Sequence, residues 1–222
     1  MTVARITWLL LKKDLRIAAR SREMLGFTLL FAVLCVIVFA FGFLQEGAAT
    51  AGYVPGVLWV TLLFSSSVSL LRLFAPEEEG GTLDLVSSTA AGTLPLFISK
   101  ATMQLLFTGL VTVVVLPLVL LFFNTELKGF GQTAAALGLG LVGMATVGTL
   151  CSALLVHVRL REVLLPLVLY PTVAPLLISG VKVTSIALAE GEGTGDWLTL
   201  MLIFDLLFVV ASPWLHGRAL QR

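Results

Sequence analysis

The sequence predicts an all-α membrane protein with six transmembrane helices and with both termini in the cytosol. Of its 222 residues, 58% are apolar and 12% are charged, with a mean hydropathy of +1.05. So little polar surface cannot cover a water-soluble domain of this size. The apolar runs thread as six spans, and the basic residues then gather on one side, which the positive-inside rule makes the cytosolic side. Of the 14 Lys and Arg residues, those on this side are Arg5, Lys12, Lys13, Arg16, Arg20, Arg22, Arg72, Lys100, Arg159, Arg161, Arg218 and Arg222, whereas Lys128 and Lys182 lie outside.

An amphipathic helix is predicted over residues 5–22, before the first span. Ile6, Leu9, Leu10 and Ile17 fall near one helical face, and basic residues lie opposite or beside them. A helix with this pattern lies in the membrane interface. Its basic residues attract anionic lipid headgroups, so they indicate a membrane surface as partner and no nucleic acid.

Each predicted span is an apolar run of about 20 residues, which is the length that crosses the hydrocarbon of a bilayer. The connections between the spans are short, so the chain is expected to form a single transmembrane domain over residues 1–222. The spans are predicted at 25–44, 55–74, 98–123, 132–156, 163–181 and 197–215, with a cytosolic loop at 75–97.

The fifth span contains Pro166, Pro171 and Pro175. Prolines at this spacing break or bend a helix unless neighbours satisfy the freed carbonyls. We therefore expect an irregular segment there, and we expect residues 176–196 to dip partly into the outer leaflet.

The fourth span is rich in small residues, including Gly138, Gly140, Gly143 and Gly148. Small residues let helix backbones approach closely within a membrane. The pattern predicts close packing against a neighbour, which is either another span of this chain or a second copy.

Asp205 lies near the middle of the sixth span. A carboxylate there costs about 2.5 to 3.5 kcal/mol on insertion scales, so its side chain should face protein and not lipid. It either belongs to a central pathway or protomer interface, or is a protonated residue bonded to a neighbouring Ser or Thr. We favour the second interpretation, under which Asp205→Asn preserves assembly.

The loop after the second span is the longest predicted cytosolic connection. Pro76 and the three acids after it favour a helix start, because carboxylates complement the positive end of the helix dipole. The glycine pair at 80–81 then permits a sharp redirection. A charge run is often only a solvated turn, but an inner connection can be as short as the one at His157, so we favour a contact surface. The expected contact residues are Glu77, Glu78, Glu79, Gly80, Gly81, Thr82, Leu83, Asp84 and Leu85.

Four segments carry a resemblance to a known family. They are Val54-Pro-Gly-Val-Leu-Trp-Val60, Leu71-Arg-Leu-Phe74, the acidic loop ending in Thr82-Leu-Asp-Leu85, and Leu94-Pro-Leu-Phe-Ile-Ser-Lys100. In order and spacing, over roughly residues 5 to 125, the chain resembles the haem exporter protein B family (CcmB) of cytochrome c maturation.

The resemblance implies an ABC-2-type permease in the bacterial cytoplasmic (inner) membrane, whose loop after the second span docks into a separate ATP-binding subunit (CcmA-like). It also implies a haem-handling membrane protein (CcmC-like), a small membrane subunit (CcmD-like) and a haem chaperone (CcmE-like) as partners, with a second copy of the chain as a further candidate. ATP would be bound by the partner subunit, and haem would be the cargo. The sequence has no GxxxxGK[ST] phosphate loop, so ATP chemistry belongs to another chain and no enzymatic activity is expected of this one.

Two other functions were weighed. The first is an ABC-2-type exporter permease for lipid, glycan or drug, with the same loop docking. The second is an intramembrane hydrolase, which is disfavoured because His157 and His216 lie at span ends and no GxSxG turn is present. Haem is most often ligated by His, and both histidines are placed at the cytosolic boundary, so no haem ligand and no metal site are predicted on this chain.

Overall fold

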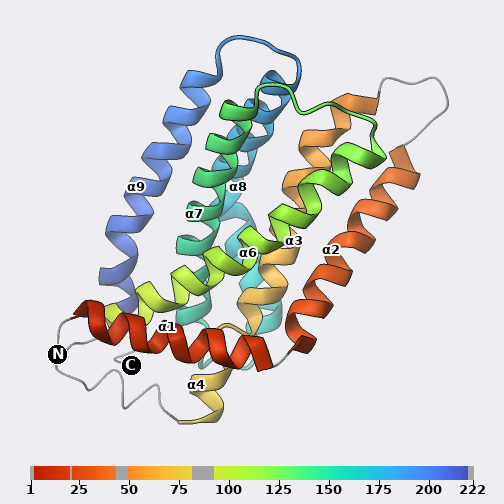
Figure 1. Cartoon of the computed structure of the whole chain (residues 1–222). Helices are drawn as coiled ribbons and strands as arrows, with labels where there is room; N and C mark the ends of the chain where they lie inside the picture. The colour runs from red at the N-terminus through yellow and green to blue at the C-terminus, as the bar shows by residue number, and fades with distance from the viewer. Residues whose placement is uncertain (1–2, 21, 44–49, 82–92, 220–222) are drawn as a thin grey trace.

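The computed structural model describes residues 3–20, 22–43, 50–81 and 93–219, and within these ranges every regular element is a helix (Figure 1). Six helical segments are long and apolar enough to cross a membrane, which confirms the predicted fold class. The helices are α1 (Val3–Arg20), α2 (Arg22–Phe43), η1 (Thr50–Tyr53), α3 (Val54–Leu71), α4 (Ala75–Glu79), α6 (Leu94–Phe122), α7 (Phe130–Leu154), α8 (Arg161–Leu188) and α9 (Thr194–Ala219).

The six long helices form a bundle with α3 and α7 at its centre. In α3 and α7 most of the membrane-length segment is buried, whereas α2 and α9 expose most of theirs at the two flanks. α7 packs along α8 and α9, and α3 packs along α2, α6 and α8. The exposed apolar surface of the outer helices suits contact with lipid.

One end of the bundle is covered by α1, which lies across the long helices and packs along α6 (Figure 1). α4 and the α7–α8 connection lie at this same end, which we call the α1 end. The α6–α7 and α8–α9 connections and η1 lie at the opposite end. The amphipathic pattern of residues 5–22 thus corresponds to a separate helix outside the spans.

α8 is a single α-helix from Arg161 to Leu188, with Pro166, Pro171 and Pro175 inside it. The prediction of an irregular segment in the fifth span is therefore wrong. A proline removes one backbone hydrogen bond without necessarily ending a membrane helix, because packing from neighbours stabilises the turns on either side. α8 has such neighbours in α3, α7 and α9, and it continues well beyond residue 181.

The close packing predicted for the glycines of α7 is present and intramolecular. Trp59 of α3 is buried between Gly140 of α7 and Gly180 of α8, and its Nε1 donates a hydrogen bond of 3.1 Å to Thr184 Oγ1. A Cβ atom at Gly140 or Gly180 would lie only 2.3 Å or 2.4 Å from the indole ring. This Trp59 notch locks α3, α7 and α8 together at the centre of the bundle.

Candidate functional site at the α1 end

The α1 end contains α4 and the glycine pair after it, which are the described part of the loop that the sequence singles out for contact with a partner. α3 ends at Leu71, and after a short turn the chain forms α4, with Pro76 in its first turn as predicted. Gly80 caps the C-terminal end of α4, and Gly81 follows with a φ of 58°, a conformation that glycine adopts without strain. The helix therefore ends at the glycine pair, as predicted, and the course of the chain after Gly81 lies outside the described residues.

Glu77 does not face solvent. Its side chain is 1% exposed and is held by two lysines from different helices. Lys100 of α6 places its Nζ 2.6 Å from Glu77 Oε2, and Lys13 of α1 donates to Glu77 Oε1. Of the three adjacent acids, the first thus points into the chain and is not available as an outward contact.

The two lysines also contact a second carboxylate, that of Asp14 in α1. Asp14 Oδ2 lies 3.0 Å from Lys100 Nζ, and Asp14 Oδ1 lies 3.3 Å from Lys13 Nζ. Each lysine therefore contacts both acids, and we call this closed set of Lys13, Asp14, Glu77 and Lys100 the charge ring. Its two positive and two negative charges balance.

Most of the charge ring is withdrawn from water. The side chains of Asp14 and Lys100 are 5% and 2% exposed, whereas that of Lys13 is 40% exposed. Burial by itself lowers the pKa of Lys13, but the hydrogen bond and charge of Glu77, together with Asp14, outweigh it and raise that pKa above its ordinary value of 10.5. The Phe74 ring, 5.7 Å from Lys100 Nζ, adds a cation–π contact.

Glu78 is placed differently from Glu77, although it is the next residue of α4. Its side chain is 44% exposed, and its Oε2 forms an ion pair with Arg161 at the start of α8, whose Nη1 lies 2.5 Å away. Gly80 and Gly81 are exposed beside it. The side chain of Glu79 and residues Thr82, Leu83, Asp84 and Leu85 lie outside the described part of the chain.

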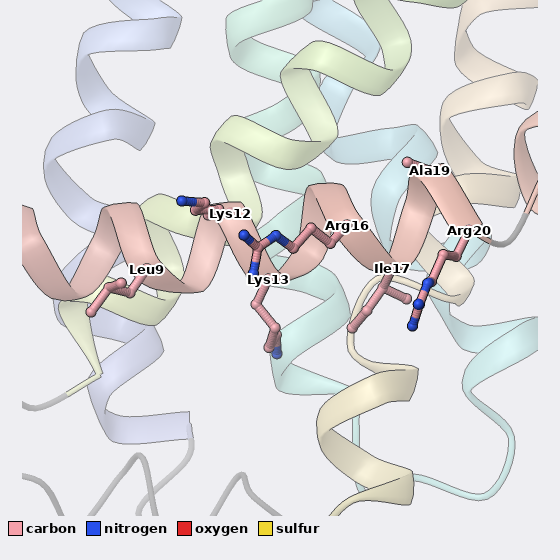
Figure 2. A pocket seen from close by; sticks show the side chains of 7 residues that line it. All are labelled: Leu9, Lys12, Lys13, Arg16, Ile17, Ala19 and Arg20. Carbon is pink, nitrogen blue, oxygen red and sulfur yellow. The ribbon is translucent and has the colours of Figure 1, made fainter.

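The outer face of α1 combines basic and apolar side chains. Figure 2 shows a hollow along this helix whose lining residues all belong to α1. Trp8 and Leu9 are exposed on the same helix. Such a mixture suits the headgroup region of a membrane, as the amphipathic pattern predicts. The hollow is lined by Leu9, Lys12, Lys13, Arg16, Ile17, Ala19 and Arg20.

Asp205 lies in α9 on the face that packs against α7. Its side chain is 4% exposed, and its Oδ1 lies 2.5 Å from the position that a Cβ atom at Gly143 would occupy. Met201 and Ser212 are buried on the same helix. The carboxyl group therefore faces protein, as both interpretations of this residue require. Neither of its oxygens has a hydrogen-bond partner among the described residues, so the expected bond to a neighbouring Ser or Thr is not present.

Comparison with known proteins shows the family of this chain. Residues 5–222 match the family described as "CcmB protein". The chain belongs to the CcmB family. The match covers all six membrane-length helices, beyond the part of the chain in which the sequence motifs lie.

Relatives of this CcmB family member include proteins named "Heme exporter protein B". Those of Rhodobacter capsulatus and Paracoccus denitrificans are each 31% identical to it, over 212 and 215 residues, and each alignment covers 96% of this chain and 97% of the relative. The protein of the same name from Bradyrhizobium diazoefficiens is 26% identical over 214 residues, which is 96% of each chain.

A polar cluster that was not predicted from the sequence lies between α3 and α6 of this CcmB family member. Gln104 Nε2 donates to Ser69 Oγ at 2.8 Å, to Ser66 Oγ at 3.0 Å and to Thr108 Oγ1 at 3.1 Å. Ser69 also donates to the Ser66 carbonyl within α3, and the bonds from Gln104 to both serines join α6 to α3. A signal was available, since Gln104 interrupts an apolar run and residues 65–69 contain four serines.

The charge ring was missed as well. Lys100 and Asp14 are charges within otherwise apolar faces, and this pattern indicates a buried counter-charge. Among the described residues no group of three His, Cys, Asp or Glu side chains gathers as a metal site would require. His157 is exposed in the α7–α8 connection, and the side chain of His216 lies outside the described part of the chain.

Proposed function

We propose that this chain is the permease subunit of an ABC transporter complex in c-type cytochrome biogenesis. It would couple ATP hydrolysis by a separate subunit to haem export or delivery, or to release of the haem-loaded periplasmic chaperone. The names of the full-length relatives support haem as cargo, and the six membrane-length helices support a multi-pass protein of the bacterial inner membrane. The chain itself would be a mechanical transducer and not a catalyst.

The proposal places the α1 end in the cytosol. Lys12, Arg16, Arg72 and Arg161 belong to helices or turns at this end, whereas the basic residue Lys128 lies in the connection at the other. Basic residues next to spans are retained on the cytosolic side. An ATP-binding subunit, which is cytosolic, could then reach α4.

The observation that carries the proposal is the position of α4. This short helix is separate from the long helix α3 and lies at the α1 end, with Glu78, Gly80 and Gly81 exposed. An exposed acid beside two glycines offers a charge and an open backbone to a partner. We assign the contact with the ATP-binding (CcmA-like) subunit to these three residues, to Glu79 and to residues 82–85, and we assign Glu77 an internal role.

The remaining partners are part of the same proposal. A haem-handling membrane protein (CcmC-like), a small membrane subunit (CcmD-like) and a haem chaperone (CcmE-like) would complete the complex. A second copy of the chain is a further candidate partner. ATP would be held by the partner subunit, and no cofactor is assigned to this chain.

Affinity purification in mild detergent, with identification of the attached chains, tests the proposal. We expect an ATPase and a haem-handling membrane protein to be attached to the wild-type chain. Glu78→Lys should lower the amount of attached ATPase while leaving membrane insertion intact. Glu190→Lys is the matched control, because Glu190 is also an exposed acid paired with a base, Lys128, but lies at the opposite end.

The outcomes separate the alternatives. A stable chain that purifies alone contradicts the proposal. An attached ATPase without any haem-handling protein or chaperone supports an ABC-2-type exporter for another cargo, such as lipid, glycan or drug. Equal ATPase attachment in the Glu78→Lys and Glu190→Lys variants would make the tip of α4 a solvated turn.

A further inference from the structure

The charge ring joins three separate parts of the chain. Lys13 and Asp14 belong to the interfacial helix α1, Glu77 belongs to α4, and Lys100 belongs to α6, which enters the membrane. α6 packs extensively against α1, whereas no described helix packs extensively against α4. The ion pairs that join α4 to α1 and to α6 are both made by the side chain of Glu77.

We propose that the charge ring is the joint through which movement of α4 reaches the membrane helices, with Glu77, Lys13, Asp14 and Lys100 as positioning residues for transport. This inference rests on the proposed function, because it assumes that a partner moves α4. The partner would bind the exposed residues Glu78, Gly80 and Gly81. Glu77, the buried neighbour of Glu78 in the same short helix, would then pull on Lys100 of α6 and on Lys13 of α1.

The chemistry of the ring suits this role better than it suits simple stabilisation. A buried ion pair contributes little net stability, because desolvation of the charges offsets their attraction. Loss of one partner, by contrast, is strongly unfavourable, since it leaves a buried charge unpaired. A network of this kind keeps its members in one arrangement, so α4 cannot move away from α6 and α1 without carrying them along.

The geometry also predicts which member can be changed most safely. Lys13 is the only one of the four with substantial exposure, and Lys100 stays in contact with both carboxylates when Lys13 is removed. Lys13→Met should therefore fold and insert, yet it breaks the direct contact between α1 and α4. Glu77→Gln removes the negative charge that both lysines share and should have the larger effect.

The first experiment measures coupling in the assembled complex, as cytochrome c formed per ATP hydrolysed. Glu77→Gln should lower this ratio roughly tenfold or more, as expected when one member of a buried network is lost, while the ATPase stays attached. Lys13→Met should lower it less. Glu190→Gln, which removes the acid of the exposed pair with Lys128, is the matched control and should leave the ratio unchanged.

A variant in which all four charges are reversed tests whether the ion pairs themselves are needed for coupling. The variant Lys13→Glu, Asp14→Lys, Glu77→Lys and Lys100→Glu keeps positive and negative charges alternating around the ring, so it should recover coupling relative to Glu77→Gln. Coupling in assembled Glu77→Gln and Lys13→Met complexes equal to that of wild type would overturn the proposal. So would an assembled four-charge variant that couples no better than Glu77→Gln.

A second experiment needs no partner. Amide hydrogen exchange in the isolated chain reports how firmly α4 is held, and Lys13→Met should speed exchange at residues 75–79 relative to wild type and to Lys128→Met. Unchanged exchange would contradict the joint. Absence of an attached ATPase would instead contradict the proposed function, so failures of the two proposals appear in different measurements.

Discussion

Gly140→Ala tests whether the Trp59 notch holds the bundle together. The added methyl group would lie 2.3 Å from two atoms of the Trp59 ring, whereas carbon atoms in contact are normally about 3.5 to 4.0 Å apart. The ring cannot simply shift away, because its other side faces Gly180 and its Nε1 is bonded to Thr184. Some part of this three-helix contact must therefore open.

The expected cost follows from these two contacts. Overpacking a core costs about 1 to 3 kcal/mol, and loss of the Trp59–Thr184 hydrogen bond adds about 0.5 to 1.5 kcal/mol. Gly140→Ala should thus lower the free energy of unfolding by about 2 to 4 kcal/mol. Gly138→Ala is the control on the same helix, because a Cβ atom there meets nothing within 4 Å, and it should gain about 0.5 to 1 kcal/mol from helix propensity.

Reversible denaturant titration in detergent micelles measures both variants. Trp59→Phe removes the ring atoms that the new methyl group would strike, so Gly140→Ala should cost less in a Trp59→Phe background than in wild type. Equal stability of Gly140→Ala and Gly138→Ala, or a cost of Gly140→Ala that does not depend on Trp59, would refute the notch as described.

Three further perturbations follow from the buried polar groups. Asp205→Asn keeps the shape of the side chain and should assemble like wild type in gel filtration; an assembled variant that fails in cytochrome c maturation would give the carboxylate a role in transport. Gln104→Leu removes the donor shared by Ser66 and Ser69 and should cost about 0.6 to 1.7 kcal/mol in the same denaturant titration, the range found for such bonds in membranes. Because the folded pKa of Lys13 is raised above 10.5, its contribution to stability is complete below that pH and is lost as pH rises through the folded pKa; wild type should therefore lose more stability than Lys13→Met on going from about pH 10 to pH 12.

The long apolar runs predicted the fold because their length alone decides whether a helix can cross a bilayer. The glycines of α7 also predicted close packing, and Gly140 indeed receives Trp59. The sequence could not predict α8 as one helix, since local proline chemistry opposes it and only packing against α3, α7 and α9 sustains it.

The acidic residues of α4 show a second feature that could not be predicted from the sequence, namely which of them is buried. Glu77 and Glu78 look alike in sequence, but the rotation of about 100° between adjacent helix residues places the first toward Lys100 and the second toward Arg161 and solvent. Choosing between them requires the position of α1 and α6, which periodicity does not give. The available signal was that Lys100 and Asp14 lie on otherwise apolar helix faces, because a charge on an apolar face needs a partner.

Both the proposed function and the role of the charge ring require that the α1 end, with the tip of α4, lies in the cytosol. Labelling of the thiol in a Gly80→Cys variant tests this orientation most directly. Gly80 is exposed, and it is not a member of the charge ring, so the substitution leaves the ring unchanged. The native Cys35 and Cys151 are first replaced by Ser or Ala. A membrane-impermeant thiol reagent should then label the cysteine in inside-out vesicles and not in intact cells. Labelling only from the outer face would contradict the orientation, the docking of an ATP-binding subunit and the role of the charge ring together.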